Sequence, residues 1–467
     1  MIDIKFGTDG WRAIIAQEFT VENVARVAEA TAKWVLENAN EPRVVLGFDT
    51  RFAGALFAET TLNVLCSHGI KVIYDKNFVS TPMISLAAFK LKCFAGIIIT
   101  ASHNPPSYSG YKLKSYYGGP SVPASIAKVE SLIEDKPTPY VTKSLEEWQK
   151  DGLLEFRNLE DLYFEEVASK FDLNAIKNSK LNVAYDAMYG AGQKVFNRIL
   201  PDATMLHADY NPSFKGQAPE PLHRNLTELS ELIRKGDFHI GVATDGDADR
   251  IGMYDDNGDF IDAHHIILLL IHILHKYKGM NGKVVIAFSV SNKVVQLCKA
   301  YNLDYEITKI GFKYISGIMV DEDVLVGGEE SGGIAVKGHI PERDGIWDAL
   351  VILEQLAKSG KTIRDLINEI YDVVGPFSYN RSDLHITEEL KKSIMLKCEK
   401  KEFKKFGVFD VLSSEDVDGY KFFLGDNGET VMIRPSGTEP VLRVYAEGPS
   451  PAKVQEILQS AKDTLLA

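Results

Sequence analysis

The sequence predicts an α/β protein whose parallel or mixed sheets are covered by helices on both faces. Two observations carry this prediction. Apolar runs of strand length alternate with helical patterns along most of the chain, and strands without polar alternation are typical of sheets buried on both sides. The chain also has 467 residues, which is too long for one hydrophobic core and predicts three or four domains.

The strand and helix patterns follow one another from the N-terminal region onward. The predicted strands are Arg43–Phe48, Lys71–Tyr74, Phe94–Ile99, Leu181–Asp186, Phe238–Ala243, Lys283–Phe288 and Asp323–Gly327. In Val21–Leu36 the apolar side chains fall on one face of a helix. Thr81-Pro82 predicts another helix start, with threonine as the cap and proline in the first turn. A further helix is expected over Leu353–Tyr371.

Residues 373–467 predict an α+β domain instead. Strand patterns and a closing helix from Pro451 follow one another there; the strands are Lys421–Leu424, Thr430–Ile433 and Val441–Tyr445. The segment Lys391–Lys405 is rich in lysine and glutamate. That composition predicts a solvated helix face rather than a binding surface.

The composition excludes some classes of partner. A net charge of −13 argues against nucleic acid as the main partner, although a local basic pocket would suffice for phosphorylated metabolites. Four scattered cysteines without a C-x-x-C pair favour a reducing cytosol. The N-terminal residues lack a signal-peptide pattern, and the apolar run Ile266–Ile271 is too short to span a bilayer. We expect a cytoplasmic protein that binds small molecules, not nucleic acid or membranes.

Three apolar strands run directly into polar loops, at residues 100–105, 244–250 and 328–333. In open α/β sheets, binding sites form at the carboxyl ends of strands. Three domains that each present one such loop would form a shared cleft. In the first loop Ser102, with His103 beside it, is placed to carry a covalent phosphoryl group.

The second and third loops carry carboxylates. Asp245, Asp247 and Asp249 alternate with small residues and can converge on one hard cation, for which oxygen ligands favour Mg²⁺; the alternative is a solvated acidic turn. Arg250 binds a substrate anion or neutralises these carboxylates. Glu329 and Ser331, in the third loop, suit the hydroxyl groups of a sugar, and an exposed acidic turn is the alternative.

A fourth polar loop, Arg434–Thr438, lies between two predicted strands. Gly437 allows successive N–H groups to form an anion nest, and Arg434, Ser436 and Thr438 would complete a phosphate site. A plain hairpin turn is the alternative. Near the N-terminus, Phe6–Arg12 combines a tight turn with a cation.

Together these motifs resemble the set found in the α-D-phosphohexomutase family. They are Phe6–Arg12, Thr100–Pro105, Gly110–Lys112, Asp245–Arg250, Gly328–Gly332 and Arg434–Pro440. They occur in the family's order and span the whole chain. The resemblance implies three related α/β/α sandwich domains with mixed sheets and a C-terminal α+β domain like the TATA-binding protein, around a central cleft. The boundaries we expect are 1–150, 151–256, 257–372 and 373–467.

The resemblance also implies roles for individual residues. Ser102 would be the phosphoserine, and an oxygen of its phosphoryl group would join Asp245, Asp247 and Asp249 in holding Mg²⁺. Arg12, His103 and Lys112 would surround the reacting phosphoryl group and serve proton transfer. Glu329 and Ser331 would bind sugar hydroxyls. The remaining substrate contacts would be Arg250, Lys313, Arg343, Arg434, Ser436, Gly437 and Thr438, with His339 near the sugar; structural roles remain open for Lys313, His339 and Arg343.

The activity that the resemblance implies interconverts hexose 1-phosphate and hexose 6-phosphate. It proceeds through phospho-Ser102 and a hexose 1,6-bisphosphate, which also serves as activator. Glu330 and Gly333 resemble the phosphoglucomutases and the glucose/mannose enzymes, whereas phosphoglucosamine mutases usually carry glutamine at the position of Glu330. Phosphoglucosamine mutase and a non-catalytic sugar-phosphate-binding protein are the alternatives. We expect a monomer or a homodimer.

Overall fold

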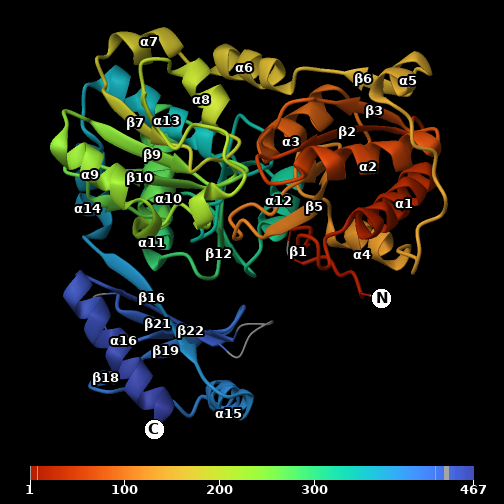
Figure 1. The fold of residues 1–467 in the computed structure, drawn as a ribbon. Helices are drawn as coiled ribbons and strands as arrows, with labels where there is room; N and C mark the ends of the chain where they lie inside the picture. The colour runs from red at the N-terminus through yellow and green to blue at the C-terminus, as the bar shows by residue number, and fades with distance from the viewer. Residues whose placement is uncertain (1, 8, 426–427, 436–440) are drawn as a thin grey trace. The chain divides into compact units, whose positions relative to one another are not determined.

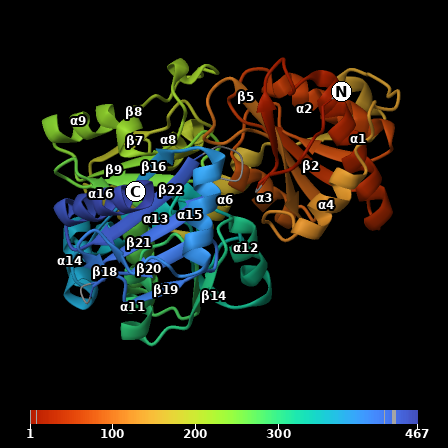
Figure 2. The ribbon, with the colours of Figure 1, turned by 90° about the horizontal axis from the view of Figure 1, so that it is seen from below.

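A computed structural model describes residues 2–7, 9–425, 428–435 and 441–467. The chain divides into two compact units, each of which is described by itself. Unit 1 comprises Met1–Val285 and Gly311–Leu366, and unit 2 comprises Ile286–Ile310 and Ile367–Ala467. Figures 1 and 2 show their helices and strands in two views.

The first part of unit 1 is built on a six-stranded mixed sheet in the order β1-β5-β4-β2-β3-β6. Strands β2, β3, β4 and β6 run parallel, whereas β5 is antiparallel to both β4 and β1. Its elements are β1 (Trp11–Ile14), α1 (Val21–Asn38), β2 (Arg43–Phe48), α2 (Gly54–Ser67), β3 (Lys71–Tyr74), α3 (Thr81–Lys90), β4 (Ala95–Ile99), β5 (Tyr108–Ser115), α4 (Pro123–Ser131), α5 (Leu145–Lys150) and β6 (Leu154–Phe156).

Helices cover both faces of this sheet because its strands are apolar on both sides. Val44 and Leu46 of β2 belong to the core cluster that also contains side chains of α1 and α2. On the opposite face, a Cβ atom at Gly47 or Gly96 would come within 2.8 Å of the Ile84 side chain of α3. Alternate residues of a strand point to opposite faces, so α3 packs closely against the face that these glycines leave open.

The next part of unit 1 carries a five-stranded mixed sheet in the order β11-β10-β9-β7-β8. Its elements are α6 (Leu159–Lys170), α7 (Leu173–Asn178), β7 (Val183–Asp186), α8 (Gln193–Ile199), β8 (Thr204–Leu206), η1 (Phe214–Gly216), η2 (His223–Asn225), α9 (Thr227–Lys235), β9 (Ile240–Thr244), β10 (Ile251–Tyr254), β11 (Phe260–Ile261), α10 (Ala263–His272) and η3 (Ile273–Tyr277). Unit 1 also contains α12 (Phe312–Asp321), α13 (Gly345–Ser359) and the antiparallel pair β14 (Val324–Gly328) and β15 (Ile334–Val336).

Unit 2 contains an antiparallel five-stranded sheet in the order β16-β22-β21-β20-β19, whose core includes residues of α15 and α16. This is the α+β pattern that the sequence predicts for the last segment. Its elements are β16 (Ser378–His385), α15 (Glu388–Glu399), β17 (Lys405–Phe406), β18 (Phe409–Asp410), β19 (Ser413–Glu415), β20 (Tyr420–Phe423), β21 (Thr430–Pro435), β22 (Val441–Gly448) and α16 (Pro451–Leu466), with α11 (Asn292–Tyr301) and β13 (Tyr305–Thr308) before them. Strand β12 (Lys283–Ala287) and helix α14 (Ile363–Val374) contain the points where the two units divide.

The predicted strands are confirmed to within three residues at their ends, but three helix predictions are wrong in detail. Ser80, not Thr81, caps α3, since its hydroxyl accepts from the Met83 N–H. The helix expected over Leu353–Tyr371 is two helices, because the first ends at Gly360 in a left-handed conformation. The lysine-rich helix ends at Glu399, and Lys405 begins β17.

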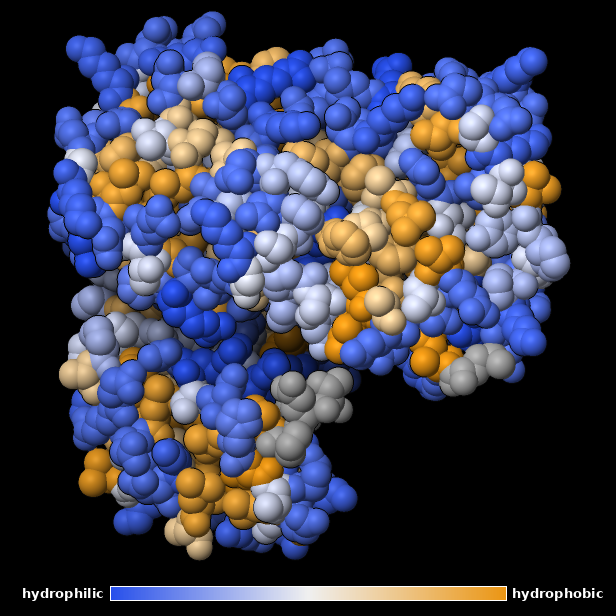
Figure 3. Space-filling model, viewed as in Figure 1, coloured by the Kyte–Doolittle hydropathy of each residue, from blue (hydrophilic) through white to orange (hydrophobic). Residues whose placement is uncertain are grey.

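The long apolar run of the chain is internal to unit 1, as predicted. It lies in α10, whose side chains from Ile266 to His272 are buried. Within the described ranges, no helix is both long and apolar enough to cross a membrane. The face drawn in Figure 3 shows many hydrophilic residues with apolar patches between them.

Candidate active site

The structure brings two loops into direct contact within unit 1. They are the serine loop, residues 100–107 between β4 and β5, and the metal-type loop, residues 245–250 between β9 and β10. Ser102 follows β4, and Asp245 follows β9. The Ser102 hydroxyl is buried and donates to Asp245 Oδ2 at 2.7 Å. Two loops that lie 143 positions apart in the chain therefore meet at the carboxyl ends of their strands, as the sequence predicts.

Ser102 adopts a strained backbone conformation. Its φ of 52° lies in the left-handed region, which is costly for a residue with a Cβ atom and is typical of functional sites when the surroundings impose it. The Ser102 N–H donates to Thr100 Oγ1 at 2.9 Å, and the Thr100 hydroxyl donates to Asp49 Oδ2 at 2.5 Å. This chain of hydrogen bonds holds the serine in position.

Arg51 is the main support of the serine loop, and the sequence analysis assigned it no role. The buried guanidinium donates to four backbone carbonyls of the loop and its continuation: those of Ser102, Asn104, Pro105 and Tyr108. Its Nε lies 3.2 Å from Asp49 Oδ2. The D-x-R spacing was visible in the sequence, but which carbonyls it would bind depends on the fold.

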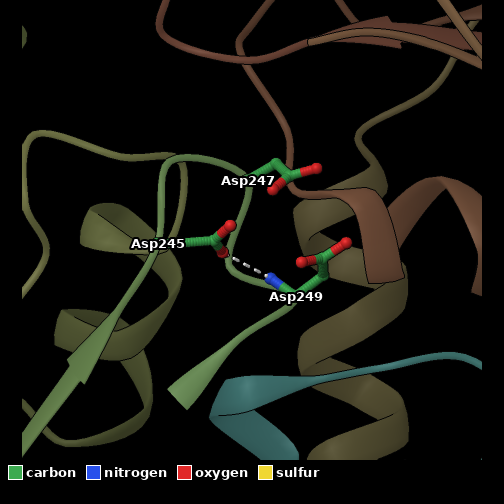
Figure 4. Close-up of side chains that lie close together, drawn as sticks. All are labelled: Asp245, Asp247 and Asp249. Atoms are coloured by element: carbon green, nitrogen blue, oxygen red, sulfur yellow. Dashed lines mark hydrogen bonds between the residues drawn. The ribbon is translucent and has the colours of Figure 1, made fainter. Parts of the chain in front are cut away.

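The carboxylates of Asp245, Asp247 and Asp249 converge, as Figure 4 shows. One oxygen from each lies within 4.8 Å of the others, and all three side chains are fully buried. The Asp249 N–H donates to Asp245 Oδ1 at 3.0 Å and tightens the turn. This geometry confirms the expected convergence and excludes the solvated acidic turn.

The cluster has the donor set that a hard divalent cation requires. One oxygen of Asp247 accepts from Thr81 and Lys112, and one oxygen of Asp249 lies beside Lys112 and Arg343. Oδ1 of Asp247 and Oδ1 of Asp249 are buried without a hydrogen-bond partner among the described residues. Buried carboxylate oxygens without partners are costly, and oxygen-only ligands suit Mg²⁺.

Crowding of like charges shows in the pKa values of the cluster. Burial, together with the neighbouring carboxylates Asp247 and Asp249, raises the pKa of Asp245 well above its usual range. Burial would also raise the pKa of Asp247, but the Lys112 ammonium and its hydrogen bond outweigh burial and lower it. A divalent cation would stabilise all three carboxylates in their ionised form.

A ring of cations surrounds these carboxylates. Lys112 Nζ lies 2.8 Å from Asp247 Oδ2, 3.3 Å from Asp249 Oδ2 and 3.0 Å from Asp9 Oδ2. Burial disfavours its charged form, but these carboxylates outweigh burial and raise the pKa of Lys112. Arg343 pairs with Asp249 at 2.7 Å and with Asp9. Sequence reasoning missed Asp9, although its place in the tight-turn motif beside Arg12 was a usable signal.

Arg12 and His103 lie beside the serine loop. Arg12 donates to Asn104 Oδ1 at 2.7 Å. The Nδ1 atom of His103 lies 3.3 Å from Ser102 Oγ. Burial, with Arg250 and Arg12 nearby, lowers the pKa of His103 well below its usual value, which favours the neutral ring.

The loop that carries Glu329 and Ser331, residues 329–333, follows β14 and is called the sugar-type loop below. Glu329 is buried, and its Oε1 accepts from the Gly311 N–H at 3.0 Å. Burial raises its pKa to about 7, although Arg343 opposes the shift. Gly332 of the same loop accepts from the Ile251 N–H at 3.0 Å, which ties this loop to the strand after the metal-type loop. Ser331 is half-buried.

Gly333 makes room for Arg343. A Cβ atom at this position would come within 2.5 Å of Arg343 Cδ, so a larger residue would displace the arginine that pairs with Asp249. Arg250 is mostly buried. Its backbone N–H donates to Asp245 Oδ1 at 3.2 Å, and its guanidinium lies 3.7 Å from Glu220. Arg343 pairs with Asp249, and the Arg250 charge favours the ionised form of Asp245. These interactions support a neutralising role for both arginines; their contacts with substrate stay predictions.

Among the residues that the structure describes, neither Lys313 nor His339 forms a hydrogen bond with the aspartate cluster. Lys313 Nζ lies over the Tyr314 ring, 5.4 Å from its centre. His339 stacks on Trp347 with 3.7 Å between ring centres, and its Nε2 lies 3.0 Å from Asp344 Oδ2. This packing favours the structural role for His339.

The fourth loop belongs to unit 2. Arg434 lies at the end of β21, with its Nε 3.4 Å from Asp418 Oδ1. The predicted phosphate contacts Ser436, Gly437 and Thr438 lie outside the described residues. The flanking strands β21 and β22 pair antiparallel, which confirms that the loop lies between two strands.

Comparison with known proteins agrees with this geometry. Four domain families match the chain: phosphoglucomutase/phosphomannomutase α/β/α domain I over residues 3–139, domain II over 161–258, domain III over 262–374 and the C-terminal domain over 394–463. A phosphoglucomutase/phosphomannomutase of Thermococcus kodakarensis is 30% identical and covers 97% of this chain and 96% of its own. A protein of Methanosphaera stadtmanae named as a probable phosphoglucosamine mutase is 31% identical, with 97% and 96% covered.

A crystal structure from Thermus thermophilus superposes with a TM-score of 0.88 at 30% identity and covers all of both chains. A buried serine beside an acidic cluster, on this fold, defines an intramolecular phosphotransferase. The chain belongs to the phosphoglucomutase/phosphomannomutase family, the α-D-phosphohexomutases. The predicted architecture of three α/β domains and a C-terminal α+β domain is confirmed.

Proposed function

We propose that this enzyme interconverts hexose 1-phosphate and hexose 6-phosphate through phospho-Ser102 and a hexose 1,6-bisphosphate, with glucose as the preferred sugar and mannose as a second one. The observation that carries the proposal is the contact of 2.7 Å between Ser102 Oγ and Asp245. It places a strained, buried hydroxyl at the edge of a cation-compatible cluster. Phosphoryl transfer depends mainly on such positioning and on charge neutralisation.

The bonds exchanged are the same in both halves of the cycle. The phosphorus–oxygen bond to Ser102 Oγ breaks while a bond to the free sugar hydroxyl forms, and the hydroxyl proton passes to a nearby base. The bisphosphate then turns end for end, and its other phosphoryl group returns to Ser102 Oγ. His103, 3.3 Å from that oxygen, is placed to accept and return the proton, whereas Lys112 and Arg12 supply positive charge.

Mg²⁺ fits the donor set described above, and Asp245, Asp247 and Asp249 would hold it together with a phosphoryl oxygen of phospho-Ser102. The ion would neutralise charge on the transferred group. Lys112 and Arg343 already balance part of the acidic cluster. We assign the non-reacting phosphate to Arg434, Ser436, Gly437 and Thr438.

Glu329 and Ser331 are proposed to bind the sugar hydroxyls, with Glu330 favouring glucose over glucosamine. Phosphoglucosamine mutase is the second candidate, because several similar proteins carry that name. The proposed partners are hexose phosphates alone, with neither nucleic acid nor membranes, and the proposed state is a monomer or homodimer in the cytoplasm. Four free, buried cysteines are compatible with a reducing compartment.

The test of the proposal is Ser102→Ala. Incubation with glucose 1-phosphate and glucose 1,6-bisphosphate should give no isomerisation and no phosphorylated protein by mass spectrometry, while binding of glucose 1-phosphate persists. Ser107→Ala is the matched control, since Ser107 lies in the same loop but is exposed, and it should retain turnover. Near-normal isomerisation by Ser102→Ala would refute the proposed mechanism. Comparison of kcat/KM for the 1-phosphates of glucose, mannose and glucosamine would identify the sugar.

A further inference from the structure

Unit 1 contains a cavity that the active-site residues above do not line. It is a cavity of about 220 Å³ beside β7, β8 and η1, and its walls include Tyr189, His207, Phe214, Lys215 and Glu228. Pockets for drug-sized ligands span roughly 300–1,000 Å³. This cavity therefore has room for a smaller molecule.

Strained backbone gathers around the cavity. Five of its wall residues other than glycine have left-handed φ values, namely Met188 (47°), Tyr189 (57°), His207 (46°), Phe214 (46°) and Lys215 (48°). Such conformations persist only where the surroundings impose them, and they cluster at ligand clamps and switch regions. Their concentration at one cavity indicates a functional wall rather than a packing defect.

Two polar groups of the cavity wall, the Lys215 ammonium and the Tyr189 hydroxyl, interact with each other, and this contact raises the pKa of Lys215. The Tyr189 hydroxyl is buried and makes no hydrogen bond of normal geometry to any residue that the structure describes. The Lys215 side chain is exposed, and no ion pair involving it occurs in the described part of the chain. Its Nζ lies over the Tyr189 ring, 5.2 Å from the centre. A carboxylate or phosphate oxygen can accept hydrogen bonds from both groups.

Other residues of the cavity wall offer acceptors. His207 is held between two carboxylates, with Nδ1 2.9 Å from Asp186 Oδ1 and Nε2 3.1 Å from Glu228 Oε2. The hydrogen bond to Asp186 raises the pKa of His207, although burial opposes this effect. The Glu228 side chain is 67% exposed, so its carboxylate remains accessible to the hydroxyl groups of a ligand.

The cavity wall also touches the supports of the active site. The Phe214 ring lies under the Arg51 guanidinium, 5.0 Å from its Cζ to the ring centre, and Arg51 holds the carbonyls of the serine loop. The Tyr189 carbonyl accepts from Thr50 Oγ1 at 2.8 Å. A shift of Phe214 or Tyr189 would therefore change the position of the serine loop.

We propose that this cavity is a regulatory site for a small hydroxylated anion, and that its occupancy alters the serine loop through Phe214 and Arg51. The anionic group, a carboxylate or a phosphate, contacts Lys215 and Tyr189, and the hydroxyl groups contact Glu228. The inference does not depend on the proposed function, because binding and loop order are both measured without turnover.

Calorimetric titration of the full chain tests the site with three probes on one carbon skeleton: glycerate, glycerol 3-phosphate and glycerol. We expect at least one of the anions to bind and glycerol not to bind. Loss of a charge-assisted contact in Lys215→Ala should raise the Kd about tenfold or more, and Tyr189→Phe should raise it less. Lys194→Ala is the control, because Lys194 is also an exposed lysine of this region but does not line the cavity.

The outcomes separate the cavity from the active site. Binding of glycerate alone identifies a carboxylate ligand, binding of glycerol 3-phosphate alone identifies a phosphate ligand, and both results support the site. Binding that survives Lys215→Ala but disappears in Arg434→Ala belongs to the substrate site and overturns the proposal, as does the absence of binding by both anions. Hydrogen exchange of residues 99–110 should change with the bound anion in the wild type and not in Lys215→Ala; unchanged exchange overturns the coupling to the serine loop.

Discussion

The serine loop and the sugar-type loop both follow a buried strand of unit 1, but the protein holds them differently. The serine loop is held by Arg51, which donates to three of its carbonyls and to that of Tyr108 at the start of β5, and by Thr100, which accepts from the Ser102 N–H. The sugar-type loop is held mainly by its own turn and by one backbone hydrogen bond from Ile251. Its buried carboxylate, Glu329, accepts one hydrogen bond from the residues that the structure describes, and the donor is the Gly311 N–H.

This difference matches the tasks of the two loops. Phosphoryl transfer requires the reacting oxygen to be held closely, and small misplacements are costly. Recognition of a sugar requires acceptors that are free to receive hydroxyl groups from the ligand. We infer that the reacting loop is sensitive to changes in its supports, whereas changes in the sugar-type loop alter substrate choice and stability.

Metal removal should have the largest effect on the reacting side. Treatment with EDTA should lower kcat by about a thousandfold or more, since a bound cation contributes several kcal/mol of transition-state stabilisation. Addition of Mg²⁺ should restore activity. The measurement is a coupled assay on samples whose metal content is checked by mass spectrometry. Full activity in a verified metal-free sample would contradict the assignment of Asp245, Asp247 and Asp249.

Arg51→Lys should have the next largest effect. A lysine cannot donate to four carbonyls in a fixed plane, so the serine loop should shift and kcat should fall about a hundredfold, while KM changes little. Steady-state kinetics with glucose 1-phosphate measures both. Arg198→Lys is the control, because Arg198 forms surface ion pairs. Equal losses in the two variants would show that the effect is not specific to the serine loop.

Glu329→Gln should change activity and stability in opposite directions. Because folding raises the pKa of Glu329 to about 7, the folded chain favours the protonated form, and this stabilisation is lost as pH rises from about 4.5 to above 7. The glutamine variant should therefore be more stable than the wild type by about 3 kcal/mol at pH 8 and by little at pH 5, since one pKa unit corresponds to about 1.4 kcal/mol. Its kcat/KM should fall about tenfold.

Denaturant unfolding at both pH values and steady-state kinetics measure these effects. Ser359→Ala is a distant control that should leave the pH dependence of stability unchanged. If Glu329→Gln were equally destabilised at pH 5 and pH 8, the raised pKa would not govern the stability of this loop.

Glu330→Gln should have the smallest effect, on substrate choice. Exchange of one acceptor for an amide should move the ratio of kcat/KM for glucosamine 1-phosphate over glucose 1-phosphate by about threefold in favour of glucosamine, the size expected for one modest hydrogen bond. Parallel assays on both sugars measure the ratio. An unchanged ratio would remove Glu330 from sugar selection and leave Glu329 as the acidic candidate in this loop.

The sequence by itself determined the strands, the loops at their carboxyl ends and the chemical type of each loop. Three aspartates at alternate positions and a serine after an apolar run are local patterns, so they can be interpreted without a fold. The start of α3 shows the limit of this approach. Thr81 looks like a cap, but Ser80 fills that position, and the Thr81 hydroxyl donates to Asp247 from another part of unit 1.

Only the tertiary structure decided which charges are paired. Arg343 meets Asp9 from 334 positions away in the chain, and Thr81 meets Asp247 from 166 positions away. The physical reason is that a buried polar group takes whichever partner the adjacent strands bring to it, whereas local sequence preferences extend over only a few residues. For the same reason the grip of Arg51 on the serine loop, and the cavity behind it, became visible only once the chain was folded.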